Sequence, residues 1–596
     1  MINGLEAFGG WARRAVLILV GMAAGAGVGS WLLSTELHRL ATIPAMVAGA
    51  AAGGVCAWVV NRASEWSPSG EGGMASGAEL RRTLSARAAR RSAKVTRPSI
   101  GQPKRAAVTE FGIRIGRSLG SRVPLYATMR DVILAVAPPQ TGKTAWASGA
   151  VIDAPGPCVA TSTRADIYRH TAPLRARRGP LYVLNPEGLG GVPSTFRWSP
   201  ISGCHNPAVA IDRAGYLLAG SPATAGIKDR NFWEGSAHKL LRCLLYAAAV
   251  GRLTMEDLAG WVGNPDDDEP LRILRRYQAT PPGWARDLAQ VLKAPDDTRE
   301  SVYLTLSLTF EFMAEPALAE ACMPESEEAG FNVARFIKRR GTLYLLGSDR
   351  RHGSLSALFS ALTGHLFTEA KRLASQRPNE RLDPPLLLAL DEAALICPVP
   401  LDRWTSDAGG RGIPILMAVQ SPSQLKDRWG EHGGETIWSN SNVKLVFGGL
   451  TVDSHLQELS NLCGERDERV RSHSTGSNGE RTTSTNLRRV KVMPPEKIRT
   501  LGEMQALVVH RTTRPTVAKL TPVWDRPDVR QQRRTAGRPE KERAARMPAT
   551  APRQRGPQRT PRPTEQARRQ AGLAPAIALR QVTGEEPVTA AKAGPA

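Results

Sequence analysis

Residues 137–144 read Ala-Pro-Pro-Gln-Thr-Gly-Lys-Thr, and they follow the apolar run at residues 132–136, Val-Ile-Leu-Ala-Val. A buried strand, a glycine-bearing loop and the first turn of a helix form the order that a phosphate-binding loop requires. Backbone N–H groups of such a loop surround a phosphate, and Lys143 adds a point charge. The segment therefore predicts a nucleotide site at the end of a strand in an α/β sheet.

The loop departs slightly from the usual pattern at its first position, which is Ala137 instead of glycine. Gly142 keeps the close backbone approach, and the Thr144 hydroxyl can ligate Mg²⁺ as the helix begins. The predicted nucleotide-binding residues are Ala137, Pro138, Pro139, Gln140, Thr141, Gly142, Lys143 and Thr144.

A second apolar run, Leu386–Leu390, ends in the carboxylates Asp391 and Glu392. By itself it could be a core strand followed by a solvated acidic turn. With a phosphate-binding loop upstream, Asp391 is expected to hold Mg²⁺ together with Thr144. Glu392 is then expected to polarise the water that attacks the γ-phosphate. The pair predicts hydrolysis of ATP or GTP.

The composition limits the class of protein. A chain of 596 residues can hold two or three domains with substantial cores. Its seven cysteines are scattered without short-spaced pairs, which argues against a zinc site or a disulfide framework and favours a reducing compartment.

The net charge of +24 is concentrated in two stretches. Residues 62–107 hold ten basic and three acidic residues, and residues 526–569 hold fourteen and four. Both are rich in small and polar residues and cannot bury enough apolar surface to fold alone. They could be solvated linkers and tails, or they could attract anionic lipid or nucleic acid. Lipid is the preferred partner for the first stretch.

Two apolar runs near the N-terminus, residues 15–33 and 41–60, are each long enough to cross a bilayer. Arg13 and Arg14 precede the first run, and Arg62 follows the second, so both ends are expected in the cytoplasm. A cleaved signal peptide is the alternative for the first run. A two-helix transmembrane hairpin returns the nucleotide site to the cytosol, where ATP is available.

Strand and helix patterns beyond the hairpin predict a sheet interrupted by a helical domain. Strand-like runs alternate with helices up to about residue 205, and helical periodicity dominates residues 206–339. The sheet resumes at residue 342, and residues 466–490 form a polar surface excursion. We predict a cytoplasmic N-terminus (1–14), the hairpin (15–60), a basic linker (61–107), a nucleotide-binding domain (108–205 and 340–520), an inserted all-α domain (206–339) and a disordered basic tail (521–596).

The order of motifs from about residue 10 to 520 resembles the type IV coupling proteins, the TraG/TraD-like membrane ATPases of conjugative DNA transfer. The motifs are Leu184-Asn185-Pro186, Arg197-Trp198-Ser199-Pro200, Asn231-Phe232-Trp233, Asp391-Glu392, Gly410-Arg411-Gly412-Ile413, Gln420-Ser421-Pro422-Ser423-Gln424-Leu425, Asn442-Val443-Lys444 and Leu459-Ser460-Asn461-Leu462-Cys463-Gly464. Many members carry an Asp-Pro-Lys-Gly-like turn where this chain has residues 162–166, Ser-Thr-Arg-Ala-Asp. Arg164 keeps a cation there.

The resemblance implies a RecA-like fold, a homo-hexamer and two further catalytic residues. Gln420 would sense the γ-phosphate, and Arg411 would reach the nucleotide of a neighbouring subunit. A turn amide for Gln420 and a surface arginine for Arg411 are the plainer interpretations. With Lys143 and Glu392, these residues form the predicted catalytic set.

The function that the resemblance implies is an ATPase in the cell membrane that uses ATP and Mg²⁺ to drive DNA, with bound relaxase, towards a type IV secretion channel. Its expected partners are secretion-channel and relaxosome proteins and membrane lipid. Two alternatives remain: an FtsK-like double-stranded DNA translocase, and a nucleotide-binding recruitment platform for secreted proteins. The C-terminus lacks the winged-helix pattern usual in the first alternative.

Overall fold

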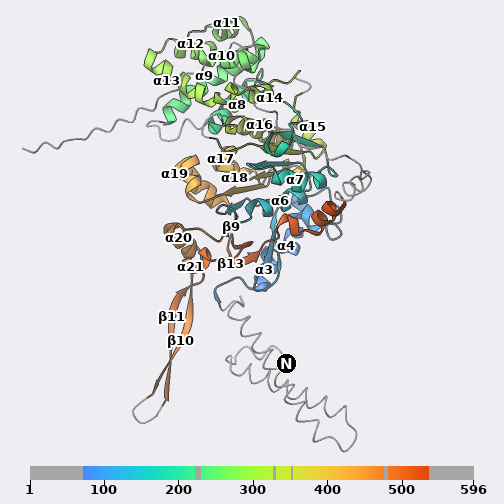
Figure 1. Cartoon of the computed structure of the whole chain (residues 1–596), viewed down its shortest axis with the longest axis vertical. Coiled ribbons are helices and arrows are strands. Elements are labelled where there is room, and N and C mark those ends of the chain that lie inside the picture. The colour runs from blue at the N-terminus through green and yellow to red at the C-terminus, as the bar shows by residue number, and fades with distance from the viewer. Residues whose placement is uncertain (1–71, 222–229, 327–329, 351–353, 476–480, 536–596) are drawn as a thin grey trace, which may run out of the picture. The chain divides into compact units, whose positions relative to one another are not determined.

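The structure is a computed structural model, and it describes residues 72–221, 230–326, 330–350, 354–475 and 481–535 (Figure 1). The chain divides into a compact unit that ends at Arg534 and a second unit, residues 535–596. The predicted hairpin at residues 15–33 and 41–60 and residues 536–596 of the predicted basic tail (521–596) lie outside the described residues. Among the residues that are described, we find no helix with the length and apolar character needed to cross a bilayer.

An eleven-stranded sheet forms the centre of the described chain, in the order β2-β1-β13-β12-β9-β3-β8-β7-β4-β6-β5. The six strands from β3 to β5 in this order, together with β9, run parallel, whereas β1, β2, β12 and β13 extend the sheet in antiparallel pairs. The strands are β1 Gly112–Ser118, β2 Pro124–Thr128, β3 Ile133–Val136, β4 Cys158–Ser162, β5 Leu181–Leu184, β6 Thr342–Leu346, β7 Leu387–Leu390, β8 Ile415–Val419, β9 Val443–Phe447, β12 Gln505–His510 and β13 Thr513–Lys519.

Helices cover both faces of this sheet, as its strands require. Alternate residues of β3 enter different cores: Leu134 and Val136 pack in one, Ile133 and Ala135 in the other. Parallel strands buried on both faces read as continuous apolar runs, which is why these strands could be predicted. The covering helices include α6 Lys143–Asp153, α7 Asp166–Arg175, α16 Ser356–Ser375, α17 Ala393–Ile396, α18 Leu401–Asp407, α19 Ser423–Asn440, α20 Asp453–Cys463 and α21 Pro495–Arg499.

The predicted helical insertion is helical in the structure (Figure 1). Its central helix is α9, and a capping box between Thr254 and Asp257 starts α10. The insertion comprises α8 Pro207–Gly220, α9 Arg230–Gly251, α10 Met255–Gly263, α11 Glu269–Arg276, α12 Trp284–Leu292, α13 Asp296–Thr309, α14 Pro316–Ala321 and α15 Val333–Lys338.

The second half of the basic linker is folded, although its composition alone does not provide a core. It forms α3 Gly77–Thr83, α4 Ala86–Arg91 and α5 Ala93–Thr96. Leu80 and Leu84 are buried with residues of β1 and β2 in one of the two main cores. These helices are therefore stabilised by the sheet edge on which they pack.

The polar excursion at residues 466–490 is a two-stranded antiparallel ribbon, separate from the main sheet (Figure 1). Its strands are β10 Glu465–Thr475 and β11 Arg481–Lys491. Backbone pairing over eleven residue pairs holds the ribbon, and pairing of this kind leaves no hydropathy signal in the sequence.

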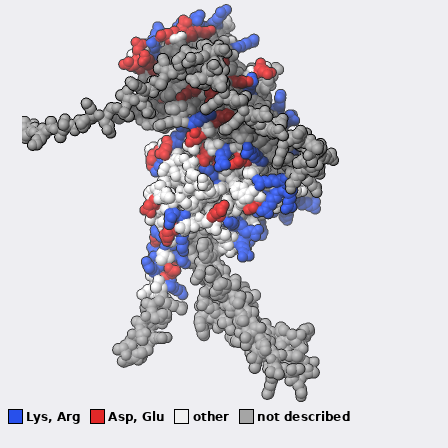
Figure 2. Space-filling view, viewed as in Figure 1, with Lys and Arg blue, Asp and Glu red and all other residues white. Residues whose placement is uncertain are grey.

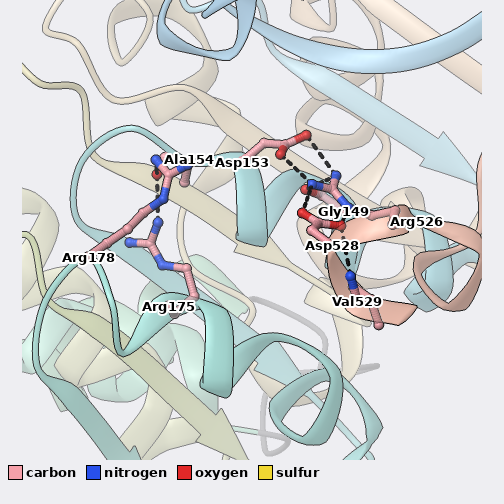
Figure 3. A network of polar contacts seen from close by, with 8 residues as sticks. All are labelled: Gly149, Asp153, Ala154, Arg175, Arg178, Arg526, Asp528 and Val529. Carbon is pink, nitrogen blue, oxygen red and sulfur yellow. Dashed lines mark hydrogen bonds and ion pairs between the residues drawn. The ribbon is translucent and has the colours of Figure 1, made fainter. Parts of the chain in front are cut away.

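The segment after the last strand of the sheet docks on α6 (Figure 3). Arg526 donates to both carboxylate oxygens of Asp153 at 2.7 and 2.8 Å and also pairs with Asp528. Val523 and Val529 pack on Ala145 and Ile152 of α6. The C-terminal end of the described chain is thus held against the helix that begins at the phosphate-binding loop.

Candidate nucleotide site

The segment at residues 137–144 lies where a phosphate-binding loop must lie. β3 ends at Val136, and α6 begins at Lys143. Gly142 has φ of 91° and Gln140 has φ of 64°, both in the left-handed region. A glycine adopts this region without steric cost, so Gly142 lets the chain turn directly into the helix. The N-terminus of α6 therefore faces the loop and favours an anion.

The two carboxylates stand opposite the start of α6. The Thr144 hydroxyl donates to Asp391 Oδ2 at 2.6 Å, and Lys143 forms a buried ion pair with Glu392. Glu392 has φ of 55°, a strained conformation for a residue with a side chain. Residues 247 and 249 positions apart in the chain thus meet, because β3 and β7 are both parallel strands with only β8 between them.

Gln420 completes this group. It follows β8, the strand between β3 and β7, and its Nε2 donates to Glu392 Oε2 at 3.2 Å. Its backbone N–H donates to the Gln424 side chain at 2.8 Å, which fixes the start of the following turn. The structure therefore brings Lys143, Glu392 and Gln420 together.

Asp391 is almost fully buried, and its environment perturbs its titration. Burial raises the pKa of the carboxyl to about 6, while the hydrogen bond from Thr144 and the charge of Lys143 act in the opposite direction. Its Oδ2 also lies 3.5 Å from the Ser162 hydroxyl, whereas Oδ1 has no hydrogen-bond partner among the described residues.

These residues fit a Mg²⁺–nucleotide complex. A buried carboxylate oxygen without a partner is costly unless a ligand satisfies it, and Asp391 Oδ1 is such an atom. The donors at this point are a carboxylate and a hydroxyl oxygen, which are ligands that Mg²⁺ prefers. The cation of Lys143 and the start of α6 suit the phosphates.

Two loops far along the chain pack on the phosphate-binding loop, and the sequence analysis did not find them. A Cβ at Gly142 would lie 2.4 Å from Met504 Sδ, so Met504 sits directly on this glycine. Gly449 approaches Pro138 and Thr141, because a Cβ there would lie within 4.0 Å of both. Neither loop carries a recognisable motif, although the glycine pair at 448–449 marks a turn.

Arg411 does not join this site. It precedes β8, whereas Gln420 follows it, so the two residues lie at opposite ends of one strand. Its guanidinium pairs with Glu380 and lies 3.5 Å from Asp407. The hydrogen bond with Glu380 and the charge of Asp407 raise the pKa of Arg411 above its ordinary value. Arg411 is therefore one strand length from the loop at residues 137–144.

The turn at residues 162–166 contributes a hydroxyl and not a cation. Ser162 lies beside Asp391, and Thr161 donates to the Asp391 carbonyl at 2.9 Å. The Arg164 side chain is 75% exposed and pairs with Asp166 at 3.1 Å. The cation expected at this turn therefore faces solvent.

Comparisons with known proteins agree on one group. Residues 385–503 match the family model described as the TraM recognition site of TraD and TraG. The chain is 22% identical over 395 residues to the conjugal transfer protein TraG of Rhizobium radiobacter, covering 64% of this chain and 59% of that protein. It is also 22% identical over 364 residues to TraG of Agrobacterium fabrum, covering 58% and 53%. The chain thus spans somewhat more than half the length of these curated relatives.

Solved structures show the same fold. The conjugative coupling protein TrwB lacking its first 70 residues aligns with a TM-score of 0.53 at 18% identity, over 68% of this chain and 88% of that one. TrwB in complex with ADP and Mg²⁺ aligns with a TM-score of 0.51 at 19% identity, over 72% and 91%. The chain therefore shares the fold of TrwB, an α/β fold with a helical domain. In motif order, family model, curated relatives and fold, the chain is similar to the type IV coupling proteins.

Proposed function

We propose that the protein is a membrane-anchored ATPase that couples DNA, with its bound relaxase, to a type IV secretion channel. The observation that carries this proposal is that Lys143 and Thr144 contact Glu392 and Asp391 where the central parallel strands end. The TraG relatives are named as conjugal transfer proteins, and TrwB as a coupling protein that binds ADP and Mg²⁺.

In the proposed reaction, Thr144 and Asp391 hold Mg²⁺, which supplies positive charge to the phosphate oxygens. Lys143 turns from Glu392 to the phosphates when nucleotide binds, and this frees the Glu392 carboxylate to orient water. Gln420 hydrogen-bonds Glu392 in the absence of nucleotide, and it is placed to position the same water. Arg411 acts on the nucleotide of a neighbouring subunit, because it cannot reach its own.

The oligomer and the anchor are parts of the same proposal. An arginine supplied across an interface makes hydrolysis depend on assembly, which fits a homo-hexamer. The hairpin at residues 15–33 and 41–60 is proposed to hold the assembly in the cell membrane, with the bulk of the chain and both termini in the cytoplasm. The helical insertion and the 385–503 region are proposed to contact relaxosome and secretion-channel proteins.

The test is phosphate release from ATP by the full chain reconstituted in lipid nanodiscs, with and without single- or double-stranded DNA. We expect hydrolysis that DNA stimulates several-fold. Lys143→Ala should abolish it, whereas Lys239→Ala, at an exposed lysine of α9, should not change it.

The other outcomes separate the alternatives. Hydrolysis that only double-stranded DNA stimulates would favour a translocase of the FtsK type. Hydrolysis without stimulation by either DNA, together with tight binding of a secreted protein, would favour a recruitment platform. No hydrolysis by the wild-type chain would overturn the proposal.

A further inference from the structure

The folded part of the basic linker forms a groove rich in arginine. Helices α3 and α4 and the turn before β2 enclose a space of about 710 Å³. Five exposed arginines line it: Arg81, Arg82, Arg87, Arg91 and Arg122. Figure 2 shows blue side chains gathered where Figure 1 labels α3 and α4.

The positive charge of this groove is not neutralised by the described part of the chain. None of its five arginines forms an ion pair with a described carboxylate. Helices α3 and α4 contain one acid, Glu79, which is turned away. Its carboxylate accepts hydrogen bonds from the backbone and the side chain of Arg514 on β13, at 2.8 and 3.0 Å. The Arg91 side chain donates to the Arg82 carbonyl, which leaves its charge in place. The groove therefore presents five guanidinium charges that no described carboxylate compensates.

The frame that carries these arginines is firmly packed. Leu80 and Leu84 are buried, and the Tyr126 N–H of β2 donates to the Leu84 carbonyl at 2.6 Å. Ser76 and Ser85 cap α3 and α4 with their side chains. Because the backbone is fixed in this way, the arginines keep their spacing, and planar guanidinium groups on a fixed frame suit phosphate oxygens.

The location of the groove indicates what it binds. It lies at the β2 end of the sheet, whereas the helical insertion contacts β5 at the other end, for example through Phe331 and Tyr182. Ten strand spacings separate these ends, a distance of about 48 Å. Only sixteen residues separate the second predicted membrane span from α3, a reach of at most about 60 Å. The groove thus lies on the first described helices after the predicted hairpin, at the opposite edge of the sheet from the helical insertion.

We propose that this groove binds the headgroups of anionic phospholipids in the cytoplasmic leaflet. The inference rests on the membrane anchoring in the proposed function and adds a specific lipid site to it. Basic residues next to a membrane span gain affinity from the negative surface potential of that leaflet. Bound lipid would add a second point of attachment to the bilayer and so fix the orientation of the sheet relative to it.

The test is photo-crosslinking of the full chain in phosphatidylcholine nanodiscs that contain either a photoactivatable phosphatidylglycerol or the matching photoactivatable phosphatidylcholine. Peptides from residues 77–91 and 121–124 should react with the phosphatidylglycerol probe at least about tenfold more than with the neutral probe. The labelling should fall at 0.5 M salt, where the Debye length is about 4 Å.

The triple variant Arg82→Gln, Arg87→Gln and Arg122→Gln should lose this labelling by about tenfold or more. The matched control is Arg275→Gln, Arg276→Gln and Arg286→Gln, which removes the same charge from exposed arginines of the helical insertion and should label as the wild type does. Equal circular dichroism spectra of the two variants would show that both are folded.

Labelling of residues 15–60 by either probe tests the membrane anchoring independently of the groove. If these residues react and the groove does not, the groove inference is overturned while the anchoring stands. If neither reacts, the anchoring fails, and the inference fails with it. If the groove variant instead loses affinity for duplex DNA and the wild type shows no preference for the anionic lipid, the groove is a nucleic-acid surface.

Discussion

The ion pair between Lys143 and Glu392 links the proposed catalytic base to the lysine that is proposed to bind phosphate. Both side chains are nearly buried, at 9% and 11% exposure, so each charge is largely shielded from bulk water. Breaking a buried pair without replacing a partner is strongly unfavourable. A bound phosphate would replace Glu392 as the partner of Lys143. The Glu392 carboxylate would then keep its hydrogen bond from Gln420 and accept a second one from water.

Glu392→Gln is expected to bind ATP with near-normal affinity and to hydrolyse it about 10²–10⁴-fold more slowly, because the amide cannot act as a base. Equilibrium binding of a fluorescent ATP analogue and single-turnover phosphate release would measure the two effects. Glu187→Gln is the control, since Glu187 is also a buried carboxylate that accepts from Ser348. Normal turnover by Glu392→Gln would refute the base assignment.

Asp391 supplies a test that depends on pH. Its pKa in the folded chain, about 6, lies above the ordinary value of 3.8. The folded state then binds the proton more tightly, so this group favours folding below pH 4, and the contribution is lost as pH rises through 6. Asp391→Asn is neutral throughout, and it should raise the thermal midpoint of the nucleotide-free protein at pH 8 and raise it by a smaller amount at pH 5, where the folded carboxyl is still mostly protonated.

Asp427→Asn is the control for this comparison, because Asp427 is exposed on α19. Differential scanning calorimetry at the two pH values would measure both variants. A lower midpoint for Asp391→Asn at pH 8 would mean that the carboxylate stabilises the nucleotide-free fold, contrary to the burial argument.

At the scale of elements, the C-terminal segment acts as a clamp on α6. The Arg526 side chain is 12% exposed and binds Asp153 and Asp528 at once, which raises its pKa despite the opposing effect of burial. Arg175, the last residue of α7, and Arg178, just after that helix, donate to the carbonyl of Ala154 at the same end of α6, at 2.6 and 3.0 Å (Figure 3). The far end of the nucleotide-site helix is therefore fixed by three arginines.

Arg526→Ala should lower the free energy of unfolding by about 3 kcal/mol, because it leaves the Asp153 carboxylate, 14% exposed, without its partner. It should also increase hydrogen exchange in residues 523–535. Chemical denaturation and exchange mass spectrometry would measure these changes. Arg530→Ala removes an exposed pair with Asp525 and should cost about 0–1 kcal/mol. Equal effects of the two substitutions would contradict the clamp.

The elements that could be predicted are those with an apolar signature of their own. β3 and β7 are buried on both faces, so they appear as uninterrupted apolar runs, and the insertion shows helical periodicity. β1 could not be predicted in this way, because exposed Arg114 and Arg117 and two glycines break its pattern. The ribbon lacks an apolar face, and α3–α5 are stabilised only by the sheet edge. Each of these depends on contacts that sequence patterns do not reveal.

The same division applies within the site. Lys143, Thr144, Asp391 and Glu392 carry motif patterns, and the position of Gln420 follows from strand order. Met504 and Gly449 reach the loop only because β12 and β9 are neighbours in the sheet. Ser162 contributes through the end of β4, where a cation had been expected. Residues that act through packing on a distant loop have no local signal.

At the scale of the whole molecule, the position of Arg411 makes a prediction about assembly. If it acts on a neighbour's nucleotide, Arg411→Ala and Glu392→Gln should each be inactive alone and should complement each other when mixed. Random assembly would restore up to about a quarter of the wild-type rate, since about a quarter of the interfaces join an intact base to an intact arginine.

Phosphate release from co-expressed, co-purified mixtures would measure this complementation. Lys143→Ala mixed with Glu392→Gln serves as the control. Every subunit in that mixture lacks either the lysine or the base of its own site, so no site is complete and no rescue is expected. Absence of rescue in the first mixture would leave Arg411 as a surface arginine paired with Glu380 and Asp407.

The chain from Gly448 to Met504 leaves the sheet after β9 and returns to it at β12, and both of its ends rest on the loop at residues 137–142. Between these ends lie α20, the ribbon and α21. A shift of this loop would therefore move both ends of the segment from Gly448 to Met504 together. The arrival or departure of a phosphate would in this way reach β10 and β11 without any change in the sheet.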